Sequence, residues 1–273
     1  MDLRAALHPR NLAFNLAAVF LSVVIFMAIL APILPMPSFT SMSANRLVPP
    51  SSTHWFGTDE FGRDLFARVV HAVRISLGVG LVGVVVSSVA GVVLGLVSGY
   101  FGGAADTLIM RLLDALLAFP SLLLAIGVAA IIGPGAFGAA LALGIVGTPQ
   151  MARIVRAGCL SEREMQYVEA ARSVGTSPGA IMVRHLLPNV WHLIVVQMVL
   201  FFVVAVLTEA GLSFLGLGVQ VPVPSLGSML DDSRGLLKTA PWYALAPGIT
   251  LTAIVLALNT IGDGLRDRVE GTS

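Results

Sequence analysis

Charged side chains are scarce in this chain of 273 residues. Asp, Glu, Lys and Arg together make up 11% of it, about half the share that a soluble domain of this length carries. Hydrophobic residues make up 56% of the chain, and the mean hydropathy is +0.91. A soluble globular domain is therefore excluded, and the composition indicates an integral membrane protein.

Other scarcities exclude whole classes of site. A formal net charge of +1 provides no basic field for nucleic acid. The one cysteine, Cys159, excludes an internal disulfide and a multi-cysteine metal site, and is expected to be a small packing residue. The one lysine, Lys238, follows Leu237 and not a glycine-rich run. The chain therefore lacks a P-loop for ATP.

Long apolar runs are abundant. About 20 apolar residues are needed for one helix to cross a bilayer, and six runs meet that length. We expect an all-α membrane protein with spans at about residues 12–34, 75–97, 112–132, 136–155, 193–215 and 244–261. The first run is too long for a signal peptide and does not end in a small-residue cleavage site. We expect one transmembrane domain over residues 1–273, with its core at about 70–268.

Six spans place both chain ends on one side of the membrane. If that side is the cytoplasm, ten arginines lie inside, and five arginines and Lys238 lie outside. This excess favours cytoplasmic termini by the positive-inside rule. Four of the outside arginines lie in the loop of residues 35–74, which is long enough to carry little weight. The inside set is Arg4, Arg10, Arg111, Arg153, Arg156, Arg163, Arg172, Arg184, Arg266 and Arg268.

Glycines recur at a spacing of four in the second span. Gly91, Gly95 and Gly99 share one helix face, and small residues let helix backbones approach closely in lipid. This row predicts a close helix contact. The sequence leaves two candidates for the other side of this contact, a second subunit and another helix of the same chain.

A polar insert at about residues 156–192 interrupts the apolar spans. Ser161 and Glu164 have the spacing of a capping box, which predicts a helix start. Gly175 is placed to end that helix in the left-handed conformation. Pro178, with Ser177 as its cap, predicts the first turn of a second short helix, which runs through Arg184 and stops near Pro188. Two capped helices favour an element that a cytoplasmic partner holds, and the alternative is a helix lying on lipid head groups.

The insert is also similar to a known family. EAARSVGTSPGAIMVRHLLPN, residues 169–189, resembles the EAA loop in permease subunits of bacterial ABC importers. That resemblance implies a coupling helix that docks on a separate ATP-hydrolysing subunit. The coupling residues it implies are Glu169, Ala170, Ala171, Gly175, Ile181, His185, Pro188 and Asn189, and Leu187 also matches the family pattern. The small Ala170 and Ala171 are expected to let the partner approach the helix closely, and His185 is expected to be structural or a pH-sensitive contact.

Further stretches resemble the dipeptide, oligopeptide and nickel branch of these permeases. They are HWFGTDEFGRDLFARVVHAVRISL at residues 54–77, SGYFGG at 98–103, EAGLSFLGLG at 209–218 and NTIGDGLRD at 259–267. The N-terminal span suits the shorter, C-type partner of the permease pair. Leu226 stands where the family often has Trp, which affects a local detail of the outer loop.

This resemblance implies partners and a location. The expected partners are a second, related permease, two ATP-binding subunits, an extracytoplasmic substrate-binding protein and membrane lipid. ATP and Mg are expected on the ATPase subunits, with no cofactor, metal or catalytic residue in this chain. The expected location is the bacterial inner membrane, and the expected cargo is short peptides, with nickel or another small solute as the alternative.

Three polar residues inside the expected spans are candidates for the translocation pathway or for contact with the partner permease. They are Asp114, Glu209 and Asn259, because buried charge in a membrane is expensive and often functional. Asp114 also follows Arg111 by three residues, a spacing that allows pairing within one helix. Glu209 has no evident local partner in the sequence.

Two other functions are weighed against the importer. A stand-alone secondary transporter commonly has inverted repeats and broken helices, and the sequence shows no internal repeat. An intramembrane protease would use Ser213 in GLSF, or Asp114 with Asp263. The serine lacks the following glycine of a serine-hydrolase motif, and Asp263 lies at a span end.

Overall fold

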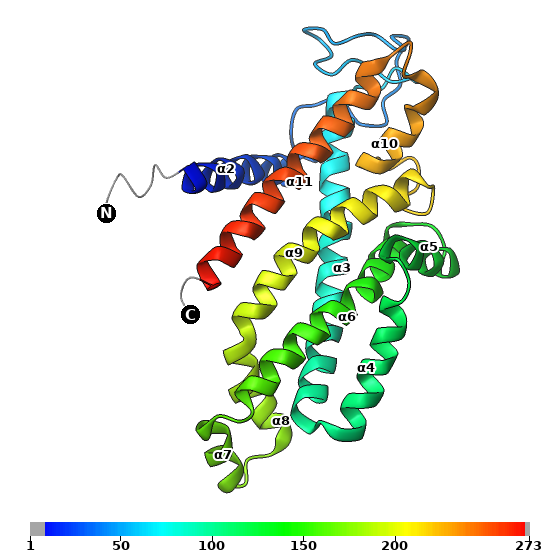
Figure 1. The fold of residues 1–273 in the computed structure, drawn as a ribbon. Coiled ribbons are helices and arrows are strands. Elements are labelled where there is room, and N and C mark those ends of the chain that lie inside the picture. Colours follow the sequence, from blue (N-terminus) through cyan, green and yellow to red (C-terminus); the bar gives the residue numbers. More distant parts are fainter. Residues whose placement is uncertain (1–8, 271–273) are drawn as a thin grey trace.

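The chain folds as a bundle of long helices, described for residues 9–270 by a computed structural model (Figure 1). Arg4 lies outside these residues. The long helices are α2 (Pro9–Leu30), α3 (Leu65–Phe101), α6 (Ala136–Glu162), α9 (Leu187–Phe214) and α11 (Pro241–Glu270). The shorter ones are α4 (Gly103–Leu117), α5 (Ser121–Ile132), α7 (Gln166–Ser173), α8 (Pro178–Ile181) and α10 (Leu226–Asp232), with η1, a π-helical segment (Met182–Leu186), and η2, a short 3-10 turn (Arg234–Leu236).

The predicted spans are confirmed except at one place. Five of the described helices are long and apolar enough to cross a membrane, and they cover five of the six predicted runs. The predicted span 112–132 is covered by α4 and α5, which are long and apolar enough only when taken together and which meet at a bend of 95°. Pro120 causes the break. It provides no backbone N–H, and it disfavours helical geometry at Phe119 before it.

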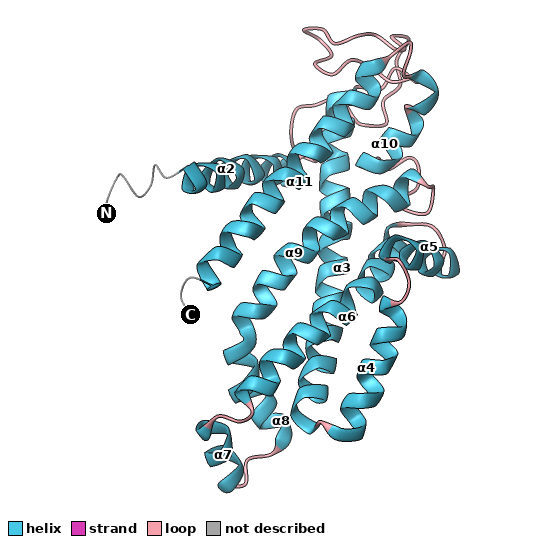
Figure 2. Ribbon diagram, viewed as in Figure 1, coloured by secondary structure: helices cyan, strands magenta, loops and turns pink. Residues whose placement is uncertain are grey.

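Non-helical chain gathers at one end of the bundle. The loop of residues 31–64, drawn in pink in Figure 2, lies beside α10 and the start of α11. Helices α7 and α8 lie at the opposite end (Figure 1). The two polar regions therefore lie at opposite ends, as expected for an outer loop and an inner insert.

A buried ion cluster holds the loop end together. Asp59 is fully buried, and its Oδ2 accepts a hydrogen bond of 2.6 Å from Arg63 Nε. The Nε atom of Arg68 lies 3.5 Å from the same carboxylate oxygen, and Arg68 Nη2 lies 3.6 Å from Asp232 of α10. The cluster joins the loop, the first turn of α3 and α10, so the charged residues of this part of the sequence serve the fold.

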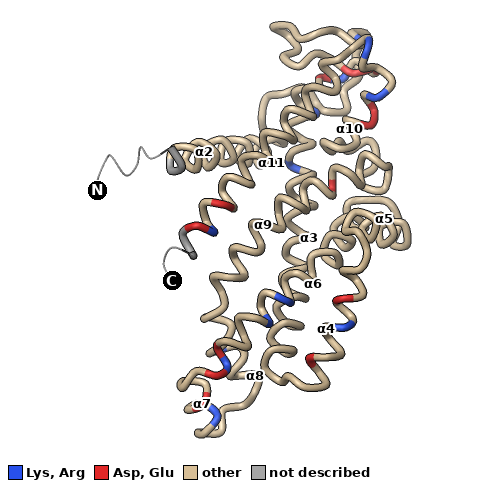
Figure 3. Tube along the Cα trace, in the orientation of Figure 1, with Lys and Arg blue, Asp and Glu red and all other residues tan. Residues whose placement is uncertain are grey.

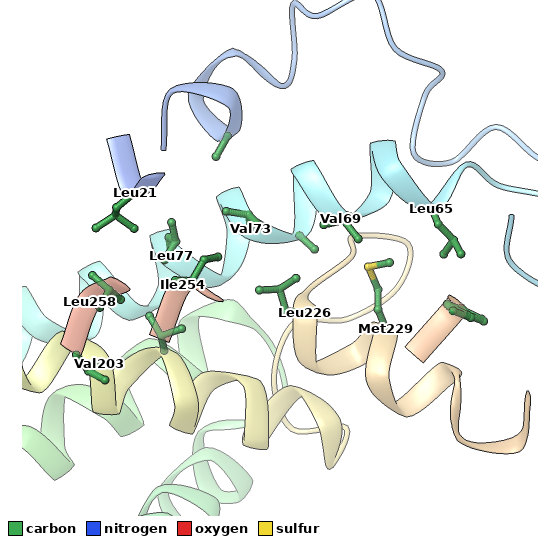
Figure 4. Packing of buried hydrophobic residues seen from close by; sticks show 14 of the residues in the cluster. Leu21, Leu65, Val69, Val73, Leu77, Val203, Leu226, Met229, Ile254 and Leu258 are labelled. Atoms are coloured by element: carbon green, nitrogen blue, oxygen red, sulfur yellow. The ribbon is translucent and has the colours of Figure 1, made fainter. Parts of the chain in front are cut away.

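Apolar packing fills the space beside this cluster. Figure 4 shows side chains from α2, α3, α9, α10 and α11 converging, among them Leu21, Val73, Val203, Met229 and Ile254. A second apolar cluster joins α3, α5, α6 and α9, and a third lies beneath α7 and α8.

The glycine row on α3 packs inside the chain, which settles the question that the sequence left open. A Cβ atom at Gly95 would lie 2.6 Å from the carbonyl oxygen of Ala152 on α6. At Gly91 it would lie 2.6 Å from Met151 Cβ, and at Gly99 2.8 Å from Cys159 Cβ. The three glycines let α3 and α6 cross closely along their lower halves. The expectation that Cys159 is a buried packing residue is confirmed.

Candidate functional site

The polar insert folds into a compact turn between α6 and α9, which we call the elbow and define as residues 163–189. It contains α7, a turn at Gly175, α8 and η1, and it forms the lower end of the molecule in Figure 1. Helix α7 ends in a Schellman motif, in which Thr176 N–H donates to Ala171 O and Gly175 N–H donates to Arg172 O, each over 3.0 Å. Gly175 has φ +79°, so the predicted left-handed helix end is confirmed.

The two ends of the elbow differ from the sequence prediction. Ser161 does not cap a helix, because α6 continues through Glu162 and keeps Ser161 in helical geometry. Helix α7 begins at Gln166, and its N-cap Met165 makes no side-chain cap. Pro178 does occupy the first turn of α8, but Ser177 makes no side-chain cap there either.

The second short helix does not stop near Pro188. Helix α8 passes through η1 directly into α9, and Pro188 lies in the first turn of α9. The π-helical geometry of η1 shifts the hydrogen-bond pattern just before Pro188, whose nitrogen has no hydrogen to donate. Residues 178–214 therefore form one continuous helical run, and the elbow is joined to the membrane helix without a flexible linker.

Buried residues anchor the elbow to the membrane helices. Val168, Ile181 and Leu186 are fully buried and pack with Leu96 of α3 and Val155 of α6. Ala171 is 8% exposed and belongs to the same cluster. Of the two alanines expected to let a partner approach closely, Ala171 packs against the inside of the subunit and Ala170 is exposed.

Polar contacts also join the elbow to α3, to the end of α6 and to the start of α9. Arg163 Nη1 donates to the carbonyl of Gly99 at the end of α3 over 2.9 Å. Tyr167 donates to Glu162 Oε2 over 2.6 Å and accepts from Asn189 Nδ2 over 3.1 Å. Desolvation and the hydrogen bond to Glu162 raise the pKa of Tyr167 to about 12. The guanidinium of Arg172 lies 5.1 Å from the ring centre of Tyr100.

The exposed surface of the elbow carries charged groups of both signs beside small and apolar groups. Glu169, Ala170 and Gly175 are exposed, and Val174, which follows α7, is 80% exposed. An apolar side chain at the tip of a polar turn is a feature that the sequence analysis missed. Its position after the last turn of α7, next to Gly175, was the available signal.

The other predicted coupling residues lie away from this tip. Pro188 and Asn189 are exposed in the first turn of α9. Asn189 Nδ2 donates to the backbone carbonyl of His185 over 2.7 Å, and the half-buried His185 ring lies 6.3 Å from the ring of Tyr167. Leu187 is also half-buried. These residues therefore belong to the part of the elbow next to α9, and not to its exposed tip.

The three pathway candidates lie in three separate places. Asp114 Oδ1 accepts a hydrogen bond of 2.5 Å from Arg153 on α6, so its partner is on another helix and not the predicted Arg111. Glu209 is fully buried within the subunit and accepts a 2.7 Å hydrogen bond from Ser213. Its side chain is therefore covered by residues of this subunit in the structure. Asn259 is exposed on α11.

Comparison with known families accounts for this arrangement. The model of the family described as "binding-protein-dependent transport system inner membrane component" matches residues 91–271, which contain the whole elbow. The chain belongs to this family. Membership places the chain in a membrane transport system of several components, in place of the secondary transporter and the protease weighed above.

Several relatives of this inner membrane component are named as permeases of peptide or glutathione transport systems. A dipeptide transport system permease protein, DppC, of Alkalihalophilus pseudofirmus is 47% identical over 247 residues, which cover 90% of this chain and 81% of the relative. The di/tripeptide permease DppC of Pseudomonas aeruginosa is 41% identical over 92% of this chain and 85% of its own. The glutathione permease GsiD of Pectobacterium atrosepticum is 44% identical over 81% of this chain and 73% of its own.

A solved structure shows the same fold. A chain of the MetNI methionine ABC transporter, in an inward-facing conformation, matches with a TM-score of 0.59 and 20% identity. The match covers 74% of this inner membrane component and 96% of that chain. At this identity the match concerns the arrangement of the helices and not the transported solute.

Proposed function

We propose that this permease forms one half of the translocation pathway of an ABC importer for short peptides, and that the elbow couples it to a separate ATPase subunit. The names of the relatives support the peptide cargo, because dipeptides, tripeptides and glutathione are all short peptides. Nickel or another small solute is the alternative cargo. The other half of the pathway is a second, related permease, and a substrate-binding protein delivers the solute.

The observation that carries the coupling role is the construction of the elbow. Its outer surface offers Glu169, Ala170 and Val174, while its inner surface is anchored by Val168 and Ile181 in the core shared with α3, α6 and α9. A partner that grips the outer surface would move the buried surface with it. The continuous helix from Pro178 to Phe214 would then carry that motion across the membrane.

The binding free energy of a docked helix is large enough to switch such a gate between its two states. To move a two-state gate from 1:99 to 99:1 requires about 5.5 kcal/mol of differential binding. ATP binding to two ATPase subunits, each holding one elbow, supplies that difference through closure of the ATPases. In this arrangement the elbow surface faces the cytoplasm, and both chain ends lie on that side.

Purification of the assembled transporter tests the coupling role. A tagged form of this chain, expressed with its partner subunits, is expected to retain an ATPase through purification. The variants Glu169→Arg and Val174→Asp change only exposed groups of the elbow, and both are expected to lose the ATPase or the coupling of hydrolysis to uptake. Asp231→Ala, at the opposite end of the molecule, is the matched control and is expected to behave as wild type.

Two outcomes would contradict the proposal. Retention of full ATPase binding and uptake by both elbow variants would show that the elbow is not the docking surface. Peptide uptake by this chain alone, driven by an ion gradient, would favour a secondary transporter. Competition of labelled dipeptide uptake by unlabelled dipeptide or by nickel distinguishes the two candidate cargoes.

A further inference from the structure

The exposed residues of α3 identify a lipid-facing surface. Between residues 75 and 97 its exposed positions are all glycine, valine or leucine, and they recur at helical spacing. Leu81, Val85, Val89 and Val93 are each between 46% and 62% exposed. A helix surface of this composition suits contact with lipid tails, which accept apolar groups and not charges.

The lower half of α6 has a different exposed surface. Between residues 146 and 160 its exposed positions are Gln150, Arg153 and Ala157. They share one face, since they are separated by three and four residues. No large apolar side chain is exposed within this stretch, although the helix is long and apolar enough to cross a membrane.

Helix α4 presents two different exposed faces. Thr107, Arg111 and Asp114 follow one another at spacings of four and three on the first face. Leu108 and Leu112, which are 63% and 62% exposed, lie on the second. Because a helix turns by about 100° per residue, Leu112 points well away from Arg111 at nearly the same depth.

An ion pair joins the polar faces of the two helices. Arg153 Nη2 lies 2.5 Å from Asp114 Oδ1, and the two side chains are 52% and 53% exposed. Asp114 lies eleven residues after the start of α4, and Arg153 lies nine residues before the end of α6. Figure 3 shows charged positions of both signs on α4 and basic positions on the neighbouring part of α6. A half-exposed ion pair at that depth is unfavourable against lipid and favourable against water.

We propose that the polar face of α4 and α6, marked by Asp114 and Arg153, lines the water-filled translocation pathway, whereas the leucine face of α4 and the valine row of α3 face lipid. The inference rests on the proposed transport function and adds which side of the subunit the solute passes. A wall that carries both signs of charge suits a zwitterion, and a short peptide with free ends is one.

Cysteine labelling in the fully assembled transporter tests this assignment. The native Cys159 is fully buried, so the parent transporter reports any background label on this subunit. Arg111→Cys and Gln150→Cys place a thiol on the polar face, and Leu108→Cys and Leu112→Cys place one on the leucine face. A membrane-impermeant, charged thiol reagent is expected to label the first two and to leave the second two unlabelled. Label at Gln150→Cys is expected to block uptake.

Three results would overturn the assignment. Equal label at Arg111→Cys and Leu112→Cys would show no polar-face pathway. Absence of label at both polar positions in the assembled transporter would show that the partner permease or lipid covers this face. Unchanged peptide uptake in both Asp114→Asn and Arg153→Gln would show that transport does not require these two charges. The labelling pattern does not depend on which solute is carried, so its failure is distinct from failure of the peptide assignment.

Discussion

The side-chain amide of Asn189, in the first turn of α9, donates a hydrogen bond of 3.1 Å to the hydroxyl oxygen of Tyr167 on α7. The same hydroxyl donates to Glu162 at the end of α6 over 2.6 Å. One phenol group therefore joins the helix that enters the elbow, the helix at its tip and the helix that leaves it. If α7 moves, we expect this contact to pull on both membrane helices.

Removal of this hydroxyl is expected to loosen α7 locally. Tyr167→Phe keeps the ring but loses both hydrogen bonds, each worth about 1 kcal/mol. Hydrogen exchange of the α7 amides, followed by mass spectrometry, is expected to quicken. Tyr100→Phe is the matched control, because the contact of Tyr100 with Arg172 involves the ring. Equal α7 exchange rates in the two variants would contradict the bracing role of Tyr167.

The same residue predicts a dependence on pH. The pKa of Tyr167 is raised from 10.0 to about 12, so the folded elbow holds this proton more tightly than the unfolded chain does. The stabilisation is complete below pH 10 and is lost as pH rises to about 12. We expect a difference spectrum between wild type and Tyr167→Phe to show phenolate formation only toward the upper end of that window. Phenolate formation centred at the ordinary pKa of tyrosine would contradict this prediction.

Gly175 is expected to tolerate asparagine better than alanine. Its φ of +79° lies in the left-handed region, where a Cβ costs about 1–2 kcal/mol. The space around it is open, with no atom within 4 Å of an added Cβ, so the whole penalty is in the backbone. Binding of the ATPase by Gly175→Ala is expected to weaken, and by Gly175→Asn to weaken less, since asparagine visits this region more readily.

Gly179 provides the control for that experiment. It lies in α8, four residues further on, and an added Cβ also meets nothing within 4 Å. Gly179→Ala is expected to be neutral or to stabilise α8, because alanine is the better helix former. A similar loss of ATPase binding in Gly175→Ala and Gly179→Ala would mean that bulk on the docking surface, and not backbone strain, sets the result.

The close crossing of α3 and α6 makes a prediction about stability. Gly95→Ala places a Cβ atom 2.6 Å from the Ala152 carbonyl oxygen, and overpacking of this kind costs about 1–3 kcal/mol. Gly78→Ala on the same helix meets nothing within 4 Å and is expected to be neutral or stabilising. Thermal unfolding in detergent measures both variants. Equal melting temperatures would argue against a tight crossing.

The buried ion cluster at the loop end is expected to be sensitive to loss of one partner. Asp59→Asn leaves Arg63 and Arg68 buried without their shared carboxylate, and breaking a buried pair costs about 3–5 kcal/mol. The pair of Asp231 and Arg234 is about half exposed, so Asp231→Asn is expected to cost less than about 1 kcal/mol. Denaturation midpoints in detergent that fall equally in both would contradict this difference.

Local chemistry made parts of the elbow predictable from sequence. The need for positive φ after a helix is met most easily by glycine, and Gly175 occupies that position. Pro178 likewise lies in the first turn of α8. The capping box at Ser161 was wrong because its four residues are equally compatible with the interior of a helix. In the structure α6 continues through Glu162, and its last turns pack on α3 through Cys159.

The sequence by itself determined that this is a membrane protein with about six apolar runs, since hydropathy and length are properties of a segment alone. It also determined the left-handed turn at Gly175. Tertiary structure decided which side chains meet across distance. It paired Asp114 with Arg153 in place of Arg111, buried Glu209, and set the glycine row of α3 against α6. Those contacts depend on how helices far apart in the chain pack together, and no local pattern of residues encodes that.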